Sequence, residues 1–178
     1  MFWRKQQIPI CLSGKNQHLF FVGTAGEEGR VNVSPKGMDS FRVLSPTLCG
    51  YLDVTGSGNE TSTHLKHDGR ITLMFNSFTR NALIYRIYGK GRVVRKGSAE
   101  YDTLVGNFED LPGARQIILI DVESTQTSCG YAVPEMELKS ERQTLRKWAE
   151  KKGDEGITAY QKSSNTVSID GLDTGLND

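Results

Sequence analysis

The run Tyr51–Thr61, YLDVTGSGNET, combines glycines with side chains that are suited to holding an anion. Its first half indicates a strand, and its second half predicts a glycine turn that opens a helix over residues 59–67. Gly56 and Gly58 let a ligand approach the backbone closely, and the first N–H groups of a helix have no partner within the helix. Further donors come from Ser57, Asn59 and Thr61. The run therefore predicts an anion site, provided that the Glu60 carboxylate points away.

A second run, VNVSPKG, places hydroxyl, amide and ammonium groups at the end of a predicted strand over residues 30–34. If this strand pairs beside Tyr51–Thr55, Lys36 reaches the same anion as a mobile point charge. Neither common phosphate loop fits, because the turn lacks the third glycine of the dinucleotide fingerprint and the Gly-Lys-Ser/Thr of a P-loop. A plain turn with a capped helix is the alternative, and Lys36 favours the anion site.

The elements that must position these residues are mostly strands. Apolar or alternating runs bounded by turn residues predict strands at 18–22, 30–34, 41–44, 48–54, 70–75, 82–95 and 116–122. Pro35 is expected to stop the second strand, and Gly89 with Gly91 to bend the sixth. Helices are expected at 59–67, at 98–108 with Ser98 as N-cap, and at 137–151 with Trp148 in its packed face. This pattern predicts a mainly β fold, a barrel with a few helices, rather than a βαβ sheet.

The composition suits one compact domain, in which residues 1–133 form the barrel and residues 134–178 a helix and an extended tail packed on it. A formal net charge of +1 provides no general attraction to nucleic acid. We expect no membrane segment, because no apolar run is long enough to cross a bilayer. Met1–Ile10 does not resemble a signal peptide, since Pro9 and two glutamines interrupt it.

The spacing of the cysteines and histidines predicts no metal site. Cys11, Cys49 and Cys129 are far apart and form no CxxC pair, so reduced thiols in a cytoplasmic protein are expected. The histidines His18, His64 and His67 complete no ligand spacing. His64 and His67 are expected on the surface of the short helix.

Three runs in this order, VNVSPKG, YLDVTGSGNETSTHL followed by DGRITLMF, and YRIYGKGRVV, resemble the FMN-binding split-barrel proteins related to pyridoxamine 5′-phosphate oxidase. The later run CGYAVPEMELKSERQTLRKWAEKKG resembles the C-terminal segment of one uncharacterised subgroup. The resemblance implies an antiparallel split barrel, bound FMN, and a homodimer with the flavin at the subunit interface. It implies that Lys36 and the turn Gly58, Asn59, Glu60 and Thr61 hold the flavin phosphate. It also implies that the ring lies beside Asn32, Val33 and Ser34, with Tyr51, Asp53, Thr55 and Ser57 alongside.

The chain departs from the authentic oxidases of that family in two places. It lacks the Arg-x-His pattern that holds their substrate phosphate, so vitamin B6 oxidation is not expected. It also has Asn59-Glu60-Thr61 where those oxidases place an Arg-Lys pair, so we expect either a lower affinity for the phosphate or a contribution from another basic side chain. The candidates are Arg42, Arg70 and Arg86. Cys129 and Tyr131 are candidates for contact with substrate, and a packing role is their alternative.

The leading hypothesis is a flavin-dependent oxidoreductase that acts on a small molecule, with the redox chemistry supplied by the flavin. No acid–base pair identifies the reaction, and no side chain is assigned as catalytic. A non-enzymatic flavin-binding protein active in stress responses is one alternative. A split barrel that binds haem or a deazaflavin is another.

Overall fold

The computed structural model describes residues 18–177, so Cys11 and Met1–Ile10 lie outside the described residues. These residues form a seven-stranded sheet, antiparallel in every pairing, with the order β2-β1-β5-β6-β7-β4-β3. The strands are β1 (Phe20–Thr24), β2 (Asn32–Lys36), β3 (Phe41–Ser45), β4 (Leu48–Val54), β5 (Arg70–Asn76), β6 (Ile84–Arg95) and β7 (Ala114–Ser128). The helices are α1 (Glu60–His67), α2 (Ala99–Leu104) and α3 (Thr144–Ser164). The predicted mainly β fold is confirmed.

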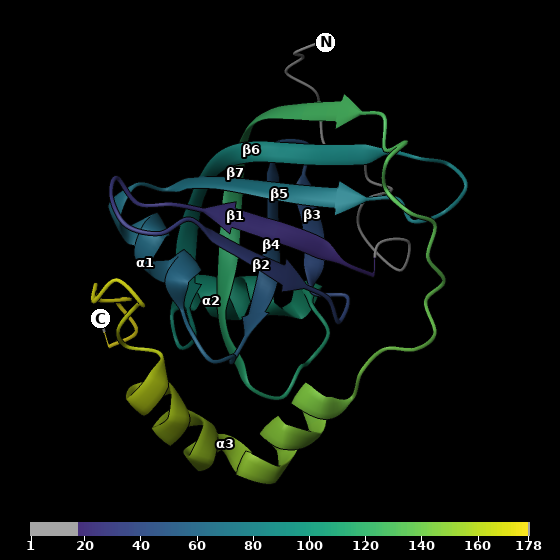
Figure 1. The fold of residues 1–178 in the computed structure, drawn as a ribbon. Helices are drawn as coiled ribbons and strands as arrows, with labels where there is room; N and C mark the ends of the chain where they lie inside the picture. Colours follow the sequence, from purple (N-terminus) through teal and green to yellow (C-terminus); the bar gives the residue numbers. More distant parts are fainter. Residues whose placement is uncertain (1–17, 178) are drawn as a thin grey trace.

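The sheet curls so that β3 and β4 lie behind β1, β2 and β5 (Figure 1). The long strands β6 and β7 pair with each other and carry this curvature, while β2 and β3 are the two edges of the split barrel. The pairing of β6 with β7 shifts register between Tyr88 and Gly89, which confirms the bend predicted there.

The run Ile117–Ile120 of β7 is apolar at every position because the strand is buried on both faces. Ile118 and Ile120 join an aromatic cluster inside the barrel, where the ring centroids of Phe20, Phe41 and Phe75 lie 5.0 to 5.7 Å apart. Ile117 and Leu119 point the other way and pack with Tyr101 and Phe108 from the α2 region. Successive side chains of a strand face opposite sides, so one run serves both clusters.

Pro35 does not stop β2, contrary to the prediction. The strand continues to Lys36, and Pro35 is paired with Phe21 of β1. Because β2 is an edge strand, a residue without an N–H group is tolerated in it. The pairing partner is also different from the expected one, since β2 pairs with β1 and not with β4.

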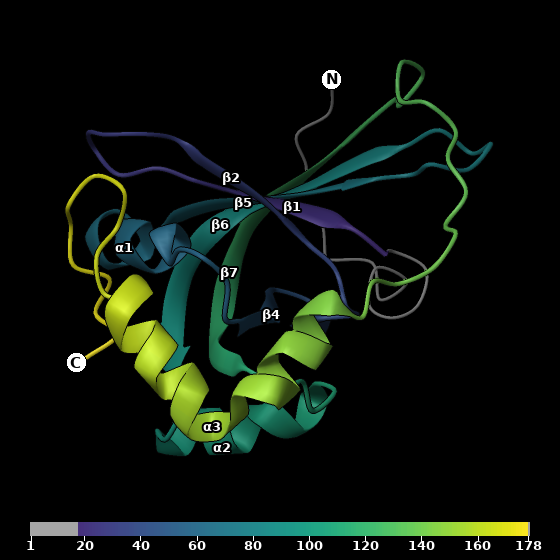
Figure 2. The same cartoon turned by 60° about the horizontal axis from the view of Figure 1, so that its bottom comes forward.

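The third helix begins later and ends later than predicted. Residues 137–143 are not helical, and α3 spans Thr144–Ser164, with Gly153 at φ 64° and ψ 175° dividing it into two halves. Figure 2 shows the halves meeting at an angle beneath the barrel. Trp148 of the first half packs on Tyr160 of the second, with ring centroids 5.1 Å apart, so the predicted packing role of Trp148 holds although the helix bounds were wrong.

The shorter helices follow the local signals closely. Ser98 caps α2, because its hydroxyl accepts a hydrogen bond from the Tyr101 N–H at 3.2 Å, and a short 3₁₀ turn over Val105–Asn107 follows. α1 ends before Gly69, whose φ of 81° suits a residue without Cβ. The tail after α3 is folded back rather than extended, with an isolated bridge between Val167 and Asp173.

We predict that Gly89→Ala destabilises the protein by about 1–3 kcal/mol, the usual cost of forcing an extra carbon into a packed site. A Cβ at this position would overlap the backbone carbonyl oxygen of Asp121 in β7. Denaturant unfolding measures the change. Gly106→Ala is the matched control, since its Cβ meets no atom within 4 Å, and it is expected to leave stability unchanged. Equal stabilities for the two variants would contradict the prediction.

Candidate functional site

A pocket of about 350 Å³ lies where β2 faces the turn between β4 and α1. We call it the glycine-turn pocket. It is lined by Asn32, Ser34, Pro35, Lys36, Asp53, Gly56, Ser57, Gly58, Asn59, Glu60, Thr61 and Arg115. The curl of the barrel, and not the expected strand pairing, brings Lys36 to the glycine turn. The two runs that the sequence singled out therefore meet in one cavity.

Three of the predicted site residues do not line this pocket. Val33 lies on the opposite face of β2 and is 64% exposed. Tyr51 is buried in the barrel, with its ring centroid 5.6 Å from the Lys36 Nζ. Thr55 is buried and donates its hydroxyl to the carbonyl of Gly113 at 2.8 Å. Their predicted contacts with a flavin remain predictions.

The buried carboxylate of Asp53 forms the floor of the pocket and is only 3% exposed. Lys36 Nζ lies 3.0 Å from its Oδ1, and Arg115 Nη2 lies 2.7 Å from its Oδ2. Gln116 Nε2 donates to the same Oδ2 at 2.8 Å. The carboxylate therefore joins β2 to β7, and each of its oxygens has a charged partner.

The charge state of this centre follows from these contacts. Burial alone would raise the pKa of Asp53, but the attraction and hydrogen bonds of Lys36 and Arg115 outweigh it and hold that pKa below its usual range. Burial, and next the charge of Asp53, raise the pKa of Tyr51 well above its ordinary value. At neutral pH the centre therefore contains two cations, one carboxylate and a neutral phenol, with a net charge of +1.

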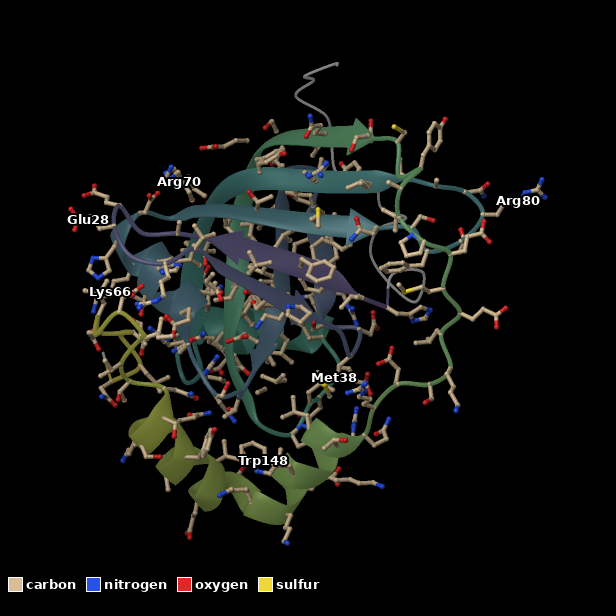
Figure 3. All side chains as sticks on the ribbon, viewed as in Figure 1. Glu28, Met38, Lys66, Arg70, Arg80 and Trp148 are labelled. Atoms are coloured by element: carbon tan, nitrogen blue, oxygen red, sulfur yellow. The ribbon has the colours of Figure 1, made fainter. Side chains whose placement is uncertain are left out.

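Arg115 is the basic residue that sequence reasoning missed. It is 5% exposed and donates to Gly58 O at 3.1 Å and to Asn165 Oδ1 at 2.8 Å, in addition to Asp53. A signal was present, since an arginine two residues before the apolar run IILI lies in a buried strand and needs a carboxylate partner. The three candidate arginines lie elsewhere: Arg42 pairs with Asp39, Arg70 with Asp68 at the periphery (Figure 3), and Arg86 donates to Ser128.

The N-terminus of α1 opens on the pocket without a side-chain cap. Asn59 occupies the N-cap position, but its Oδ1 accepts a hydrogen bond from Gln116 Nε2 at 2.9 Å instead of capping the helix. The first N–H groups of such a helix are available to an anion. Glu60 lines the pocket, and its carboxylate accepts a hydrogen bond from the Ile169 N–H at 3.1 Å.

Small polar groups complete the wall formed by β2. The Ser34 Oγ is buried and has no hydrogen-bond partner among residues 18–177. Asn32 Nδ2 donates to Thr61 Oγ1 and to Thr24 Oγ1, both at 3.2 Å. Thr24 in turn lies 3.0 Å from His64 Nδ1, and His64 is buried, so its predicted surface position was wrong. The buried Ser34 hydroxyl is a polar group that lacks a partner at the place where a ligand would lie.

The C-terminal tail holds the glycine turn in place. Asn165 is fully buried, and its Nδ2 donates to Gly56 O at 3.0 Å while its Oδ1 accepts from Arg115. Thr174, also fully buried, donates its hydroxyl to Asn165 O at 2.6 Å. Lys66 on the outer side of α1 pairs with Asp173 at 2.8 Å (Figure 3). The tail is therefore part of the site and not an appendage.

A second pocket of about 560 Å³ adjoins the first, and the two share Asn32, Ser57, Gly58 and Glu60. Its lining is mostly polar but includes exposed apolar side chains from the β2 region and from the tail. These are Val31, Val33, Val167 and Ile169. The pocket with the charged groups thus continues into one that carries apolar surface.

The candidate substrate residues Cys129 and Tyr131 lie beyond the far end of β7 from Arg115. Cys129 is exposed and Tyr131 is 86% exposed, and neither lines the glycine-turn pocket of its own chain. Cys49 is buried, and burial followed by the charge of Asp121 raises the pKa of its thiol to about 12. No cluster of metal-binding side chains occurs within the described residues, and no helix there is long and apolar enough to span a membrane.

The chain folds as an antiparallel split barrel, and the pocket between its β2 edge and the start of α1 suits an anion. These two features place it among the barrels that bind a ligand. The family described as pyridoxamine 5′-phosphate oxidase matches residues 13–129. A pyridoxamine 5′-phosphate oxidase family protein of Aspergillus flavus, ustO, is 40% identical over 174 residues, covering 88% of this chain and 70% of that protein. The chain therefore belongs to the pyridoxamine 5′-phosphate oxidase family, whose members often bind FMN.

Two solved structures are similar to this chain at low sequence identity. HupZ of Group A Streptococcus is 22% identical, with a TM-score of 0.50 over 68% of this chain and 91% of that chain. A pyridoxamine 5′-phosphate oxidase-related, FMN binding protein of Nostoc punctiforme is 12% identical, with a TM-score of 0.47 over 62% of this chain and 73% of that chain.

We predict that Asp53→Asn lowers the free energy of unfolding by about 3–5 kcal/mol, because it leaves the buried Arg115 without its counter-charge. The lowered pKa of Asp53 also means that the carboxylate stabilises the fold above its unfolded pKa near 4, and that this stability is lost as the pH falls below that value. Denaturant unfolding between neutral and acidic pH measures both effects. The exposed Asp110→Asn is the control, and a wild-type stability for Asp53→Asn would refute the role of this centre.

Proposed function

We propose that this protein binds FMN, with the flavin phosphate in the glycine-turn pocket. The observation that carries the proposal is the meeting of Lys36, the unpartnered Ser34 hydroxyl and the uncapped start of α1 in one cavity. A phosphate needs a cation and several N–H or O–H donors, and these are the groups present. Ser57 and Thr61 would add hydroxyl donors. The Glu60 carboxylate also lines the pocket, and its hydrogen bond with the Ile169 N–H holds it on the side of the tail.

The adjoining pocket suits the flavin ring. It shares four residues with the first pocket, so one ligand can extend from the phosphate site into the second pocket. Val33 lines this second pocket, which agrees with the ring contact that the family resemblance implies. A flavin site needs apolar surface beside its polar groups, and Val31, Val33, Val167 and Ile169 would supply it.

Bound FMN would supply the redox chemistry, and we propose that the protein is an oxidoreductase for a small molecule. The chain's own residues bind the phosphate, hold the turn in position through Asn165 and Arg115, and shield the site from water. Reduction of the bound flavin by NADH or NADPH, followed by reoxidation by an electron acceptor, tests this function. An inert bound flavin would instead indicate the non-enzymatic flavin-binding protein.

We also propose a homodimer with the flavin at the subunit interface. Val31, Val33, Val167 and Ile169 expose apolar surface along the rim of the ring pocket, and a second copy would cover it. Sedimentation equilibrium should give twice the mass of the chain. The free thiols of Cys49 and Cys129 fit a reducing compartment, so we place the protein in the cytoplasm.

The purified protein is expected to be yellow, or to turn yellow with added FMN, and to release flavin on denaturation. Lys36→Gln should weaken FMN binding by roughly ten- to hundredfold, because a charge-assisted hydrogen bond to the phosphate contributes about 1.5–3 kcal/mol. Quenching of flavin fluorescence measures the affinity.

Two controls locate the effect at the phosphate. Riboflavin, which lacks the phosphate, should bind wild type and Lys36→Gln equally. The exposed Lys147→Gln should bind FMN like wild type. A wild-type protein that stays colourless in excess FMN would exclude the proposal.

A further inference from the structure

A separate cavity of about 440 Å³ lies between the second half of α3 and the region where β6 ends and β7 begins. We call it the α3 cavity. Arg115 lines both this cavity and the glycine-turn pocket, and it is the one lining residue that the two share, so it forms the wall between them. The proposed FMN site leaves the α3 cavity without a role.

The α3 cavity has an excess of positive charge. Arg95, Lys96 and Lys162 line it in addition to Arg115, whose charge is matched by Asp53. Asp154 is the one carboxylate among the described lining residues. Lys96 and Lys162 have no ion pair within residues 18–177. A cleft lined mainly by one sign of charge concentrates ions of the opposite sign.

Arg95 is held rigidly at the inner end of the cavity. Its guanidinium donates to the Gln116 side-chain oxygen, to Ser62 Oγ at 3.0 Å and to Thr174 O at 2.7 Å. The carboxylate of Asp173 is near enough to interact with it electrostatically. A fixed cation requires little ordering when a ligand arrives, while the two exposed lysines can adapt their positions.

The neutral lining residues indicate which kind of anion fits. Ile157 and Leu176 offer apolar surface. The Gln161 side-chain amide donates a hydrogen bond to Thr55 Oγ1 at 2.7 Å. The Thr158 hydroxyl donates one to Asp154 O at 2.9 Å. The cations and the apolar walls are therefore the main features by which a ligand can be recognised, and Asn177 adds a polar side chain. We propose that the α3 cavity is a second binding site, which takes a small organic anion with more than one negative charge and a short carbon skeleton.

Citrate is a suitable probe, and isothermal titration calorimetry of the full chain at constant ionic strength, with sodium chloride as balance, is the measurement. Citrate should bind saturably at one site per chain. The double variant Lys96→Gln/Lys162→Gln should weaken binding by at least about tenfold, because it removes two charge-assisted contacts. Each single variant should show a smaller loss.

A control variant tests whether citrate binding depends on the lysines of the α3 cavity. Lys147→Gln/Lys151→Gln makes the same change of charge on exposed positions of α3 that do not line the cavity, and it should bind citrate within about twofold of wild type. Absence of saturable binding, or an equal loss in this control, would overturn the proposal. The result does not depend on whether the protein binds FMN.

Discussion

The buried carboxylate of Asp53 is the group on which the arrangement of the site depends. A charge removed from water is tolerated only when partners replace its hydration, and here Lys36, Arg115 and Gln116 do so. Two of these partners also bind other parts of the site. Arg115 donates to a side chain of the tail, and Gln116 donates to the N-cap residue of α1. One ion thus fixes the relative positions of the β2 edge, β7, the glycine turn and the C-terminal tail.

Short stretches of the sequence predicted much of the fold and of the site. The glycine turn, the position of α1, the Ser98 cap and the bend at Gly89 all depend on residues close together in the sequence, where backbone preferences decide the outcome. Arg115 could not be assigned in the same way, because its partner Asp53 is distant in the sequence and meets it only through the pairing of β4 with β7. His64 was misplaced for a related reason, since its burial comes from packing against β1 and not from α1 itself.

The sequence pattern predicts the structure least well in the C-terminal third of the chain. The apolar positions near Trp148 indicated a helix, but its bounds depend on Gly153, which turns the chain and lets Trp148 pack on Tyr160. The tail is polar in sequence and yet contributes the fully buried Asn165 and Thr174. The family match ends at residue 129, so these residues, which hold the glycine turn, lie outside the matched part of the chain.

Pro35 has a consequence for how copies of this chain can associate. An edge strand with a regular row of free N–H and C=O groups is a template for further strands, and such edges lead to sheet extension and aggregation. A proline in β2 interrupts that row, since its missing N–H faces outward in an edge strand. Contact between copies at this edge must then rely on side chains and not on a continuous intermolecular sheet. The residue that shapes the wall of the pocket therefore also makes this open edge a poor template for a further strand.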